Sequence, residues 1–405
     1  MKIQKILRLN DVCELIVDYL HKTAPTQEEG YPLIRTPNIK RGRLDLSSVF
    51  RVSEEIYDIW NQRAVPQTND LIMAREAPAG NVAIIKEGQI VCLGQRTVLI
   101  RPNIELVDPD FLCYFLLVPK QQGKLLAGET GATVKHVNMK DIRKLPLQHL
   151  PDLPIQKKIG KILASYDDLI ENNRRRIQLL EESARLLYRE WFVYLRFPGH
   201  EHTPIIDGIP EDWEKIHLSK VVKTQYGFTE TAQYEPIGPK FLRGKDINKT
   251  SYIEWNTVPY CSKENLEFNK FSLMVGDIVV IRMANPGEVG IIEKEIESVF
   301  ASYLVRFQIK IRVNITSYFL FYTLCSEQYQ GFIKAASTGS TRKSASAKLL
   351  VDFNIIIPSI RLLTLFDKQI IPIRKQINIL LDQNASLQQA RDILLPRLMN
   401  GEINL

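Results

Sequence analysis

The sequence lacks the motifs that would mark an enzyme. It contains no Gly-x-x-x-x-Gly-Lys-Ser/Thr phosphate loop and no Gly-x-Gly-x-x-Gly cofactor turn. The Asn-Pro-Pro-Tyr type of motif, with which amino-methyltransferases act on a flipped base, is missing as well. Its nearest string, Asn285-Pro286-Gly287, has no aromatic residue. The charged string Glu293-Lys294-Glu295 is interpreted as a surface turn rather than as part of a nuclease site. These absences favour a binding function over catalysis.

Neither a membrane span nor a disulfide framework is expected. No stretch approaches about 18 uninterrupted apolar residues, and the N-terminus lacks the apolar core of a signal peptide. The 5 cysteines are an odd number without a Cys-x-x-Cys pair, which indicates reduced thiols. The 6 histidines are scattered, and we expect no metal site, even at His200-Glu201-His202. The cytoplasm is therefore the expected location.

The sequence does contain a long internal repeat. Residues 69–85 match residues 276–292 at a constant offset, which places Arg75 on Arg282 (282 − 75 = 207). A copy of this length indicates a duplicated domain rather than a short solenoid repeat. With 405 residues and 45% apolar content, the chain has room for about two to three globular domains.

Each copy is expected to contain strands followed by a short helix. β-branched runs at 81–85 and 95–100 predict strands in the first copy. An apolar and aromatic segment at 110–118 predicts a short helix. Its copy at 317–326 follows Asn314-Ile315-Thr316, where Asn or Thr can serve as an N-cap. Both copies are therefore predicted to be mixed α/β domains.

A long helix is predicted after each domain. From Ile155 to about Phe192 a helical pattern runs almost unbroken, which at about 1.5 Å per residue gives a length of roughly 55–60 Å. The second pattern, from Phe366 to Leu398, alternates steps of four and three residues, as the seam of a coiled coil does. Pro372 lies inside this second pattern and predicts a kink or a two-piece helix.

These patterns predict an α+β fold built as a tandem repeat. The first domain covers residues 1–150 and the first helix 151–197, and the second domain covers 198–358 and the second helix 359–405. The two helices are expected to pair as an antiparallel coiled coil. Such pairing returns the second helix to the first domain and gives the chain pseudo-twofold symmetry. The alternative is that each helix only caps its own domain.

Apolar residues at steps of three and four define the expected contact between the helices. In the first helix these residues are Ile159, Ile162, Tyr166, Leu169, Ile177, Leu180 and Leu187. In the second helix they are Phe366, Ile370, Ile373, Ile377, Leu380, Leu387 and Leu394.

A basic segment occurs in both copies and is the main candidate for binding. The formal net charge of +7 and the pI near 9.0 favour an anionic partner. Segments 35–43 and 243–249 combine residues that neutralise phosphates with residues that address base edges in the major groove. The candidates are Arg35, Asn38, Lys40, Arg41 and Arg43 in the first copy and Arg243, Lys245 and Asp246 in the second. A solvated cationic loop is the alternative.

Two further pairs of loops are candidates for ligand contact. Loops 75–80 and 282–287 place an Arg between a strand and a Gly/Pro turn, which gives Arg75, Arg282 and Asn285 as candidates. Loops 131–136 and 339–344 are small, hydroxyl-bearing and basic, a composition that suits phosphate contact. Their candidates are Lys135, His136, Ser340, Thr341, Arg342 and Lys343. The alternatives are a simple hairpin turn for the first pair and a flexible surface loop for the second.

Four strings near the helices carry a family resemblance. They are the Pro-rich entry and following Gln in residues 150–159, the helix exit in 186–199, the loop in 338–343 and the C-terminal ending in 394–403. Together they resemble the specificity subunit of type I restriction-modification systems, and the resemblance covers almost the whole chain. The sequence departs from the family at two places. Leu363 stands where Gln156 would align, and the first domain lacks the Trp-Glu start that the second has at 213–214.

The resemblance implies a non-catalytic, DNA-recognition subunit. Each target-recognition domain would read one half of a split, asymmetric site in double-stranded DNA. The helices would act as a spacer and dock two copies of the methylation subunit. This chain would bind no cofactor. Adenine methylation with S-adenosylmethionine, and cleavage with ATP and Mg²⁺, would belong to the methylation and restriction subunits. The alternative is an adaptor that binds no DNA and assembles protein partners through its paired helices.

Overall fold

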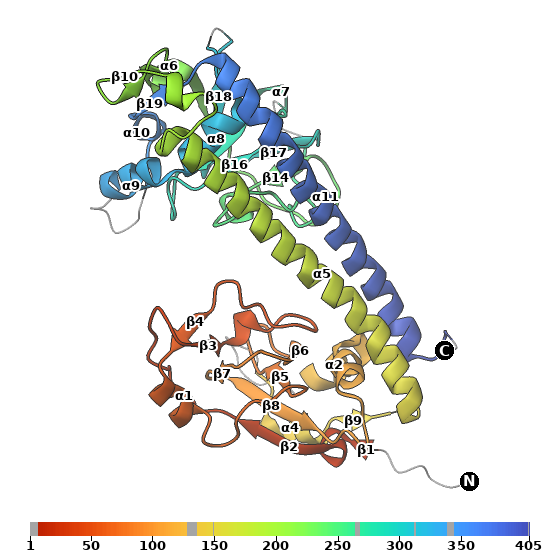
Figure 1. Ribbon diagram of the computed structural model, residues 1–405. Helices are drawn as coiled ribbons and strands as arrows, with labels where there is room; N and C mark the ends of the chain where they lie inside the picture. Colours follow the sequence, from red (N-terminus) through yellow and green to blue (C-terminus); the bar gives the residue numbers. More distant parts are fainter. Residues whose placement is uncertain are drawn as a thin grey trace. The chain divides into compact units, whose positions relative to one another are not determined.

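The computed structural model describes residues 7–127, 136–148, 150–263, 268–311, 313–337, 344–403 and 405. The chain divides into two compact units (Figure 1). Unit 1 comprises Met1–Asn172 together with Asn384–Leu405, and unit 2 comprises Asn173–Gln383. The end of the second long helix therefore belongs to the unit of the first domain, as the predicted return of that helix requires.

Unit 1 is built on two small sheets. The larger sheet has four antiparallel strands in the order β2-β8-β5-β6. Their bounds are β2 Cys13–Asp18, β5 Leu71–Ala74, β6 Val82–Ile84 and β8 Thr97–Pro102. The second sheet, in the order β4-β3-β7, has the bounds β3 Tyr31–Ile34, β4 Phe50–Val52 and β7 Cys92–Leu93. The β-branched side chains of the larger sheet are buried, apart from the half-buried Val17, which is why these short runs hold a core.

Helices complete unit 1. Helix α2 (Pro109–Leu117) packs on β6, and its N-cap is Asp108, whose carboxylate accepts the backbone N–H of Phe111 at 2.9 Å. Further short elements are α1 Glu54–Trp60, α3 Pro119–Leu126, α4 Met139–Lys144, the paired strands β1 Leu7–Arg8 and β9 Pro146–Leu147, and the 3-10 helices Leu9–Val12 and Thr36–Asn38.

Unit 2 repeats this design. Its four-stranded sheet has the order β13-β18-β15-β16, with bounds β13 Val222–Tyr226, β15 Ile278–Ile281, β16 Val289–Ile291 and β18 Leu304–Ile309. Strands β14 (Lys240–Leu242) and β17 (Ser298–Phe300) pair in parallel, as β3 and β7 do. Strands β12 (Glu214–His217) and β19 (Asn354–Ile357) pair antiparallel. The helices are α6 Leu218–Val221, α7 Phe268–Phe271, α8 Ser317–Cys325, α9 Glu327–Ala336 and α10 Ala347–Leu350.

The repeat extends to individual hydrogen bonds. The backbone N–H of Arg75 donates to the carbonyl of Arg96 at 3.0 Å, and that of Arg282 donates to Tyr303 at 2.9 Å, at the same offset (303 − 96 = 207). The N-cap of helix α8 is Thr316, whose hydroxyl accepts a backbone N–H of the first turn, as the carboxylate of Asp108 does for α2. The predicted fold class, a tandem of mixed α/β domains that each precede a long helix, is confirmed.

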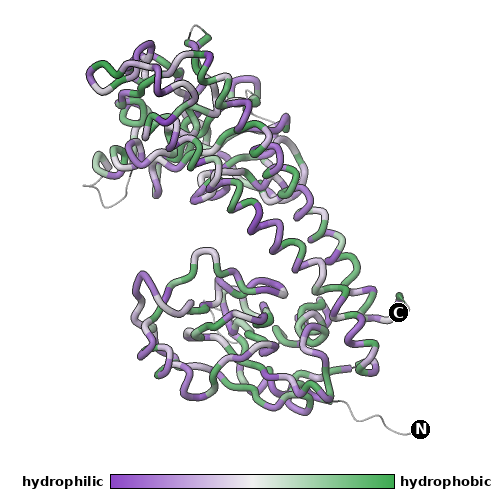
Figure 2. The backbone as a smooth tube through the Cα atoms, in the orientation of Figure 1, coloured by the Kyte–Doolittle hydropathy of each residue, from purple (hydrophilic) through white to green (hydrophobic). Residues whose placement is uncertain are grey.

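The two long helices are α5 (Leu153–Tyr188) and α11 (Ile360–Met399). A short π-helical turn, Arg189–Val193, extends α5. Helix α11 is a single 40-residue helix, so the two-piece alternative is wrong. Pro372 is exposed on this helix, where its missing N–H is away from the packed side. Polar and apolar residues alternate along both helices (Figure 2).

The α11 side of the helix contact follows the predicted seam. Of its residues, Phe366, Ile370, Ile377 and Leu380 are fully buried, and Ile373, Leu387 and Leu394 are half-buried. In unit 2, Ile377 and Leu380 pack against Ile177 of α5. In unit 1, Leu395 and Leu398 join Ile159 and Leu163 in the core of the first domain. Partner numbers on α11 fall as those on α5 rise, so the helices run antiparallel.

The α5 side of the contact requires a correction. Ile159 and Ile177 are buried, and Ile162, Tyr166, Leu180 and Leu187 are half-buried, but Leu169 is 51% exposed and does not pair. The buried positions of this stretch are instead Asp167 and Ile170. The sequence pattern predicts only apolar residues on the seam, whereas a charged residue occupies it because a buried arginine pairs with it.

Candidate nucleic-acid interface

The basic segment of unit 1 is organised by Asn38. Its side-chain oxygen accepts the backbone N–H of Arg35 at 3.0 Å, and its side-chain nitrogen donates to the carbonyl of Asp45 at 3.2 Å. The side chain is buried within the loop. The sequence predicts Asn38 at a DNA surface, but in this structure its amide groups hold the loop that presents the neighbouring cations.

Three cations of this loop lie on its outer side. Arg35, Lys40 and Arg41 are all exposed. The Arg35 guanidinium lies over the Phe50 ring, 4.2 Å from its centroid. The Lys40 ammonium donates to a backbone carbonyl of the loop, and it lies 3.7 Å from the Asp45 carboxylate. The Arg41 guanidinium donates to the Leu117 carbonyl at 2.8 Å. The exposed pair of Lys40 is weak, so this cation can turn toward an anionic ligand.

Arg43, the fourth predicted cation, points inward. Its guanidinium is buried and donates to the Asp168 carboxylate at 2.8 Å and to the Ala164 carbonyl at 3.2 Å, both on α5. The Tyr114 hydroxyl lies 3.4 Å away and itself donates to Asp167 at 2.6 Å. Burial, reinforced by Asp167, raises the pKa of Tyr114 above its usual range. Arg43 therefore fixes the first domain on its helix, and the expectation of a DNA contact is corrected.

In the copy of this segment, Arg243 and Asp246 pair with each other. Two guanidinium nitrogens of Arg243 donate to the two carboxylate oxygens of Asp246 at 2.9 and 2.8 Å, and the backbone N–H of Arg243 donates to the same carboxylate. Lys245, between them, is exposed. The pair sets the shape of the turn and leaves one edge of the Arg243 side chain half-exposed.

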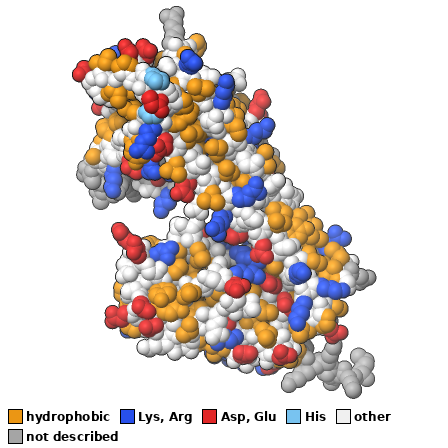
Figure 3. Space-filling model, viewed as in Figure 1, with side chains coloured by type: hydrophobic (Ala, Val, Ile, Leu, Met, Phe, Trp, Pro, Cys, Tyr) orange, Lys and Arg blue, Asp and Glu red, His pale blue; other side chains and the backbone are white. Residues whose placement is uncertain are grey.

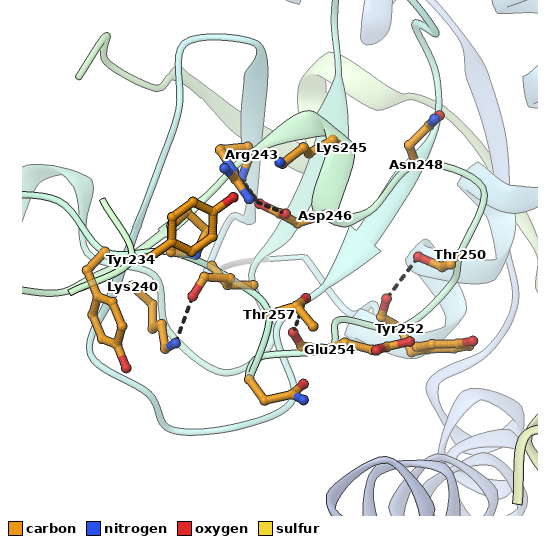
Figure 4. A pocket seen from close by; sticks show the side chains of 14 residues that line it. Tyr234, Lys240, Arg243, Lys245, Asp246, Asn248, Thr250, Tyr252, Glu254 and Thr257 are labelled. Carbon is orange, nitrogen blue, oxygen red and sulfur yellow. Dashed lines mark hydrogen bonds and ion pairs between the residues drawn. The ribbon is translucent and has the colours of Figure 1, made fainter. Parts of the chain in front are cut away.

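These predicted residues line a cleft of about 690 Å³ in unit 2 (Figure 4). Arg243, Lys245 and Asp246 all lie along it. Its other polar and aromatic lining residues include Tyr234, Lys240, Asn248, Asn256 and Tyr260, which the sequence alone does not single out. They follow no motif, because segments 234–246 and 248–260 meet only through the fold.

The chemistry of the cleft suits nucleic acid. The Lys240 ammonium donates to the Val258 carbonyl at 2.7 Å and lies 3.9 Å from the centroid of the Tyr260 ring. Tyr234 is 74% exposed and offers an open aromatic face. Asparagine amides read base edges, cations neutralise phosphates and aromatic rings stack on bases. The cleft therefore brings together all three kinds of contact.

Two hairpins adjoin the basic loops. Arg75 donates to the Val137 carbonyl at 2.9 Å, and Arg282 lies over the Tyr226 ring, 4.9 Å from its centroid. Both arginines are half-buried and brace their hairpins. At the tips, Ala77 and Ala284 have φ of 49° and 70°, a conformation that is costly for alanine and that recurs at equivalent positions. Because this strained backbone conformation recurs in both copies, we regard the two hairpin tips as candidate contact points.

The unit 2 hairpin adjoins the cleft. Asn285, an exposed candidate, donates from its side chain to the Asn248 side-chain oxygen at 2.8 Å, and Asn248 lines the cleft. His136 is half-buried beside Val137, the residue that binds Arg75. The remaining loop candidates, Lys135, Ser340, Thr341, Arg342 and Lys343, lie outside the described residues.

Sequence reasoning also missed a pair of structural glutamines. Gln122 donates to the carbonyls of Gly80 and Leu116 at 2.8 and 2.7 Å. Gln330 makes the same two bonds in unit 2, to Gly287 at 2.8 Å and to Leu324 at 2.6 Å. Each glutamine ties a hairpin to the end of a core helix. The signal was present in the repeat, since the two glutamines share one offset (330 − 122 = 208).

Charge alone does not mark the binding surface. On the face shown in Figure 3, Lys and Arg side chains are interspersed with Asp and Glu. Within the described part of the chain, no group of three or more His, Cys, Asp or Glu is placed to hold a metal ion. No described helix is long and apolar enough to cross a membrane. The candidate interface therefore rests on the loops and the cleft.

Comparison with known proteins identifies the family. The family model of the type I restriction modification DNA specificity domain matches residues 2–182 and 210–383, one match in each copy. The specificity subunit of the type I restriction enzyme MjaVIII, from Methanocaldococcus jannaschii, is 25% identical over 418 residues, which cover 99% of this chain and 93% of the relative. The HindI specificity subunit from Haemophilus influenzae is 24% identical over 372 residues, which cover 76% of this chain and 80% of the relative.

A solved structure has the same fold. The S subunit of a type I restriction-modification system from M. genitalium superposes with a TM-score of 0.54 at 16% identity, over 98% of both chains. The paired copies, the long helices and the matches of both domains agree. The chain belongs to the family of specificity subunits of type I restriction-modification systems, whose role is DNA recognition.

Proposed function

We propose that each unit of this chain reads one half of a bipartite, asymmetric site in double-stranded DNA. The observation that carries the proposal is that the two units share one framework of strands and loops but differ in the exposed residues of those loops. The braced hairpin and the basic loop recur in both units, yet unit 1 presents Arg35, Lys40 and Arg41 where unit 2 presents Lys245 beside a polar cleft. Two readers on one scaffold are what an asymmetric site requires.

A domain exchange tests this proposal. Residues 1–150 are replaced by the first domain of another family member, and the adenines methylated in cells with the cognate methylation subunit are mapped. Only one half of the recognised sequence should change. A change in both halves would contradict separate reading, and a chain that assembles with its partners without any DNA preference would favour the adaptor alternative.

The helices are proposed to set the gap between the two half-sites. Adding one heptad (about seven residues) to both helices keeps the seam in register. The additions belong between Asp167 and Glu181 in α5 and between Arg374 and Arg391 in α11. They lengthen each helix by roughly 10 Å, or about three base pairs. The methylated motif should keep both half-sequences and gain about three base pairs of gap. An unchanged gap would show that the helices do not set the spacing.

We also propose that two methylation subunits dock on the helices at equivalent places. Leu186 of α5 and Ile393 of α11 occupy the same position in the repeat (393 − 186 = 207), and both are exposed, by 41% and 53%. Large apolar side chains exposed on both helices support a protein contact there. The methylation subunits would supply S-adenosylmethionine-dependent methyl transfer, and restriction subunits would supply cleavage that uses ATP and Mg²⁺.

The docking proposal is tested by co-purification. Leu186→Glu and Ile393→Glu should each remove one of two methylation subunits from the complex, and the double variant should remove both, as measured by mass in solution. Lys157→Glu, an exposed change on the same helix, serves as the control. Loss of neither subunit in the double variant would place docking elsewhere.

A further inference from the structure

The contact between α5 and α11 contains charged residues that are sorted by helix. In unit 1, Asp167 of α5 forms an ion pair with Arg391 of α11. In unit 2, Glu181 of α5 accepts a hydrogen bond from Arg374 of α11 at 2.5 Å. The acids are therefore on α5 and the arginines are on α11. All four side chains are buried or nearly so.

Each charge is satisfied by a dedicated set of partners. Arg374 is completely buried and also donates to both carboxylate oxygens of Glu293, at 2.8 and 2.6 Å, and to the Ser251 carbonyl at 2.8 Å. Asp167 also accepts the Tyr114 hydroxyl at 2.6 Å. A buried charge is tolerated only with such partners, so the seam accepts a charge of one sign at each position.

The repeat shows what would happen if a helix met its own copy. Asp167 and Arg374 occupy the same position of the repeat (374 − 167 = 207). The position of Arg391 is taken in α5 by Ala184 (391 − 207 = 184), and that of Glu181 is taken in α11 by Gln388 (181 + 207 = 388). The two helices thus share most apolar positions, except that Asn173 and Ile177 of α5 correspond to Leu380 and Asn384 of α11, and they differ in seam charge.

Two α5 helices paired in this geometry would place Glu181 against Asp167 of the copy, because Asp167 replaces Arg374. Two α11 helices would place Arg391 against Arg374 of the copy, because Arg374 replaces Asp167. Both arrangements bring like charges together on the seam, although Arg374 keeps Glu293 and Arg391 keeps Asp392 in the α11 pair. A buried charge that loses its partner on the facing helix is destabilising. Only the α5–α11 pair places an acidic residue opposite a basic one on the facing helix.

We propose that these charges make each helix pair with the other kind, α5 with α11, and not with a copy of itself. Each half of the chain accepts the helix of the other half, whether from the same molecule or from a second copy, and rejects the helix of its own kind. The charges add a rule of partner choice to the uncharged seam, which differs between the helices where Asn173 and Ile177 of α5 correspond to Leu380 and Asn384 of α11. The rule keeps two different recognition domains in one subunit.

The full-length protein tests this rule at Arg391. Arg391→Gln removes the charge and Arg391→Glu imitates the like-charge contact. Both are also made in the Asp167→Asn background. Arg391→Glu should lower the thermal unfolding midpoint by about 5 °C or more beyond Arg391→Gln when Asp167 is present, and by much less when it is absent. The same two substitutions at Arg397, an exposed residue of α11, are the control and should differ little.

Equal midpoints for the two Arg391 variants, or a difference that persists without Asp167, would overturn the proposal.

A second measurement addresses partner choice directly. Residues 208–405 are replaced by a second copy of 1–198, so that two α5 helices must pair. Glu181→Arg in the first copy and Ala184→Arg in the second supply the missing opposite charges. The repaired chain should be monomeric with a higher unfolding midpoint than the unrepaired one. The absence of a difference, including failure of both to fold, would contradict the rule.

Discussion

The two units dock their domains on their helices with opposite charge polarity. In unit 1 the cation is on the domain, at Arg43, and the acids are on α5, at Asp167 and Asp168. In unit 2 the cation is on the helix, at Arg374, and the acid is on the domain, at Glu293. Both joints thus use an ion pair of a buried arginine, but the cation is on the domain in unit 1 and on the helix in unit 2.

The helix residues of the two joints, Asp167 and Arg374, are equivalent (374 − 167 = 207). The domain residues, Arg43 and Glu293, are not. Lys86 of unit 1, which pairs with Asp110 at 2.8 Å, corresponds to Glu293 of unit 2 (293 − 86 = 207). Arg43 corresponds to Ser251 (251 − 43 = 208), whose carbonyl accepts Arg374. Neither domain would therefore find the right charges on the helix of the other. A recognition domain moved between the halves needs the matching helix residues to move with it.

The uncharged part of the joint differs as well. At the start of α5, Gln156 is buried and accepts the backbone N–H of Asp108 at 3.0 Å while donating to the Pro151 carbonyl at 2.8 Å. In α11 the corresponding Leu363 is buried in the apolar core instead. The hydrogen bonds of Gln156 in α5 are thus replaced by the apolar packing of Leu363 in α11. This explains how the start of α11 departs from the family string without loss of the fold.

The largest expected effect is at Arg374. Arg374→Met leaves Glu293 and Glu181 without their cation in a buried site, and should lower the free energy of unfolding by about 3–5 kcal/mol. Arg391→Met should cost less, because Asp167 keeps the Tyr114 hydroxyl. Denaturant titration of the full chain measures both. Lys375→Met, an exposed neighbour on α11, is the control, and equal losses of stability at Arg374 and Arg391 would contradict the difference between the joints.

A second pair of variants gives each unit the residue of the other. Glu293→Lys places a second cation against Arg374 in a buried site and should cost about 3 kcal/mol or more. Lys86→Glu should cost only about 1–2 kcal/mol, since Lys86 and Asp110 are partly exposed. Unfolding free energies provide the comparison. If Lys86→Glu were the more damaging change, the opposite charge polarity would not describe the joints.

The bracing glutamines should behave alike in the two units. Gln122→Ala and Gln330→Ala each leave two backbone carbonyls without a donor, and each should cost about 1–2 kcal/mol. Hydrogen exchange at the hairpins 75–80 and 282–287 should rise in the corresponding unit alone. Protection that falls in both units after one substitution would show that the two frames are coupled.

The smallest effect per residue is expected for the exposed cations of unit 1. Changing Arg35, Lys40 and Arg41 together to Ala should weaken DNA binding and lower the slope of log K against log salt by roughly 0.9 for each phosphate that the loop no longer neutralises. The matched control neutralises three exposed lysines on α5, which are Lys157, Lys158 and Lys161. An unchanged slope in the loop variant, or an equal change in the control, would place the DNA away from this loop.

The sequence by itself determined the duplication, the fold class, the family and the seam of α11. These features can be recognised as patterns in the sequence: an offset of 207 residues between the copies, apolar residues at steps of four and three, and family strings at the helix ends. Apolar periodicity is visible in a sequence because burial of apolar side chains needs no particular partner. The run from Phe366 to Leu398 contains enough such steps to fix its buried face.

Only the tertiary structure decided where the charged residues lie. The sequence predicts Arg43 at DNA, Leu169 on the seam and a surface turn at Glu293, yet Arg43 and Glu293 are buried while Leu169 is exposed. A charge can be buried only when opposite charges and hydrogen bonds meet it, and Asp168 lies 125 residues from Arg43 in the chain. No local pattern reports such distant partners. The fold had to bring them together before the role of each charge could be read.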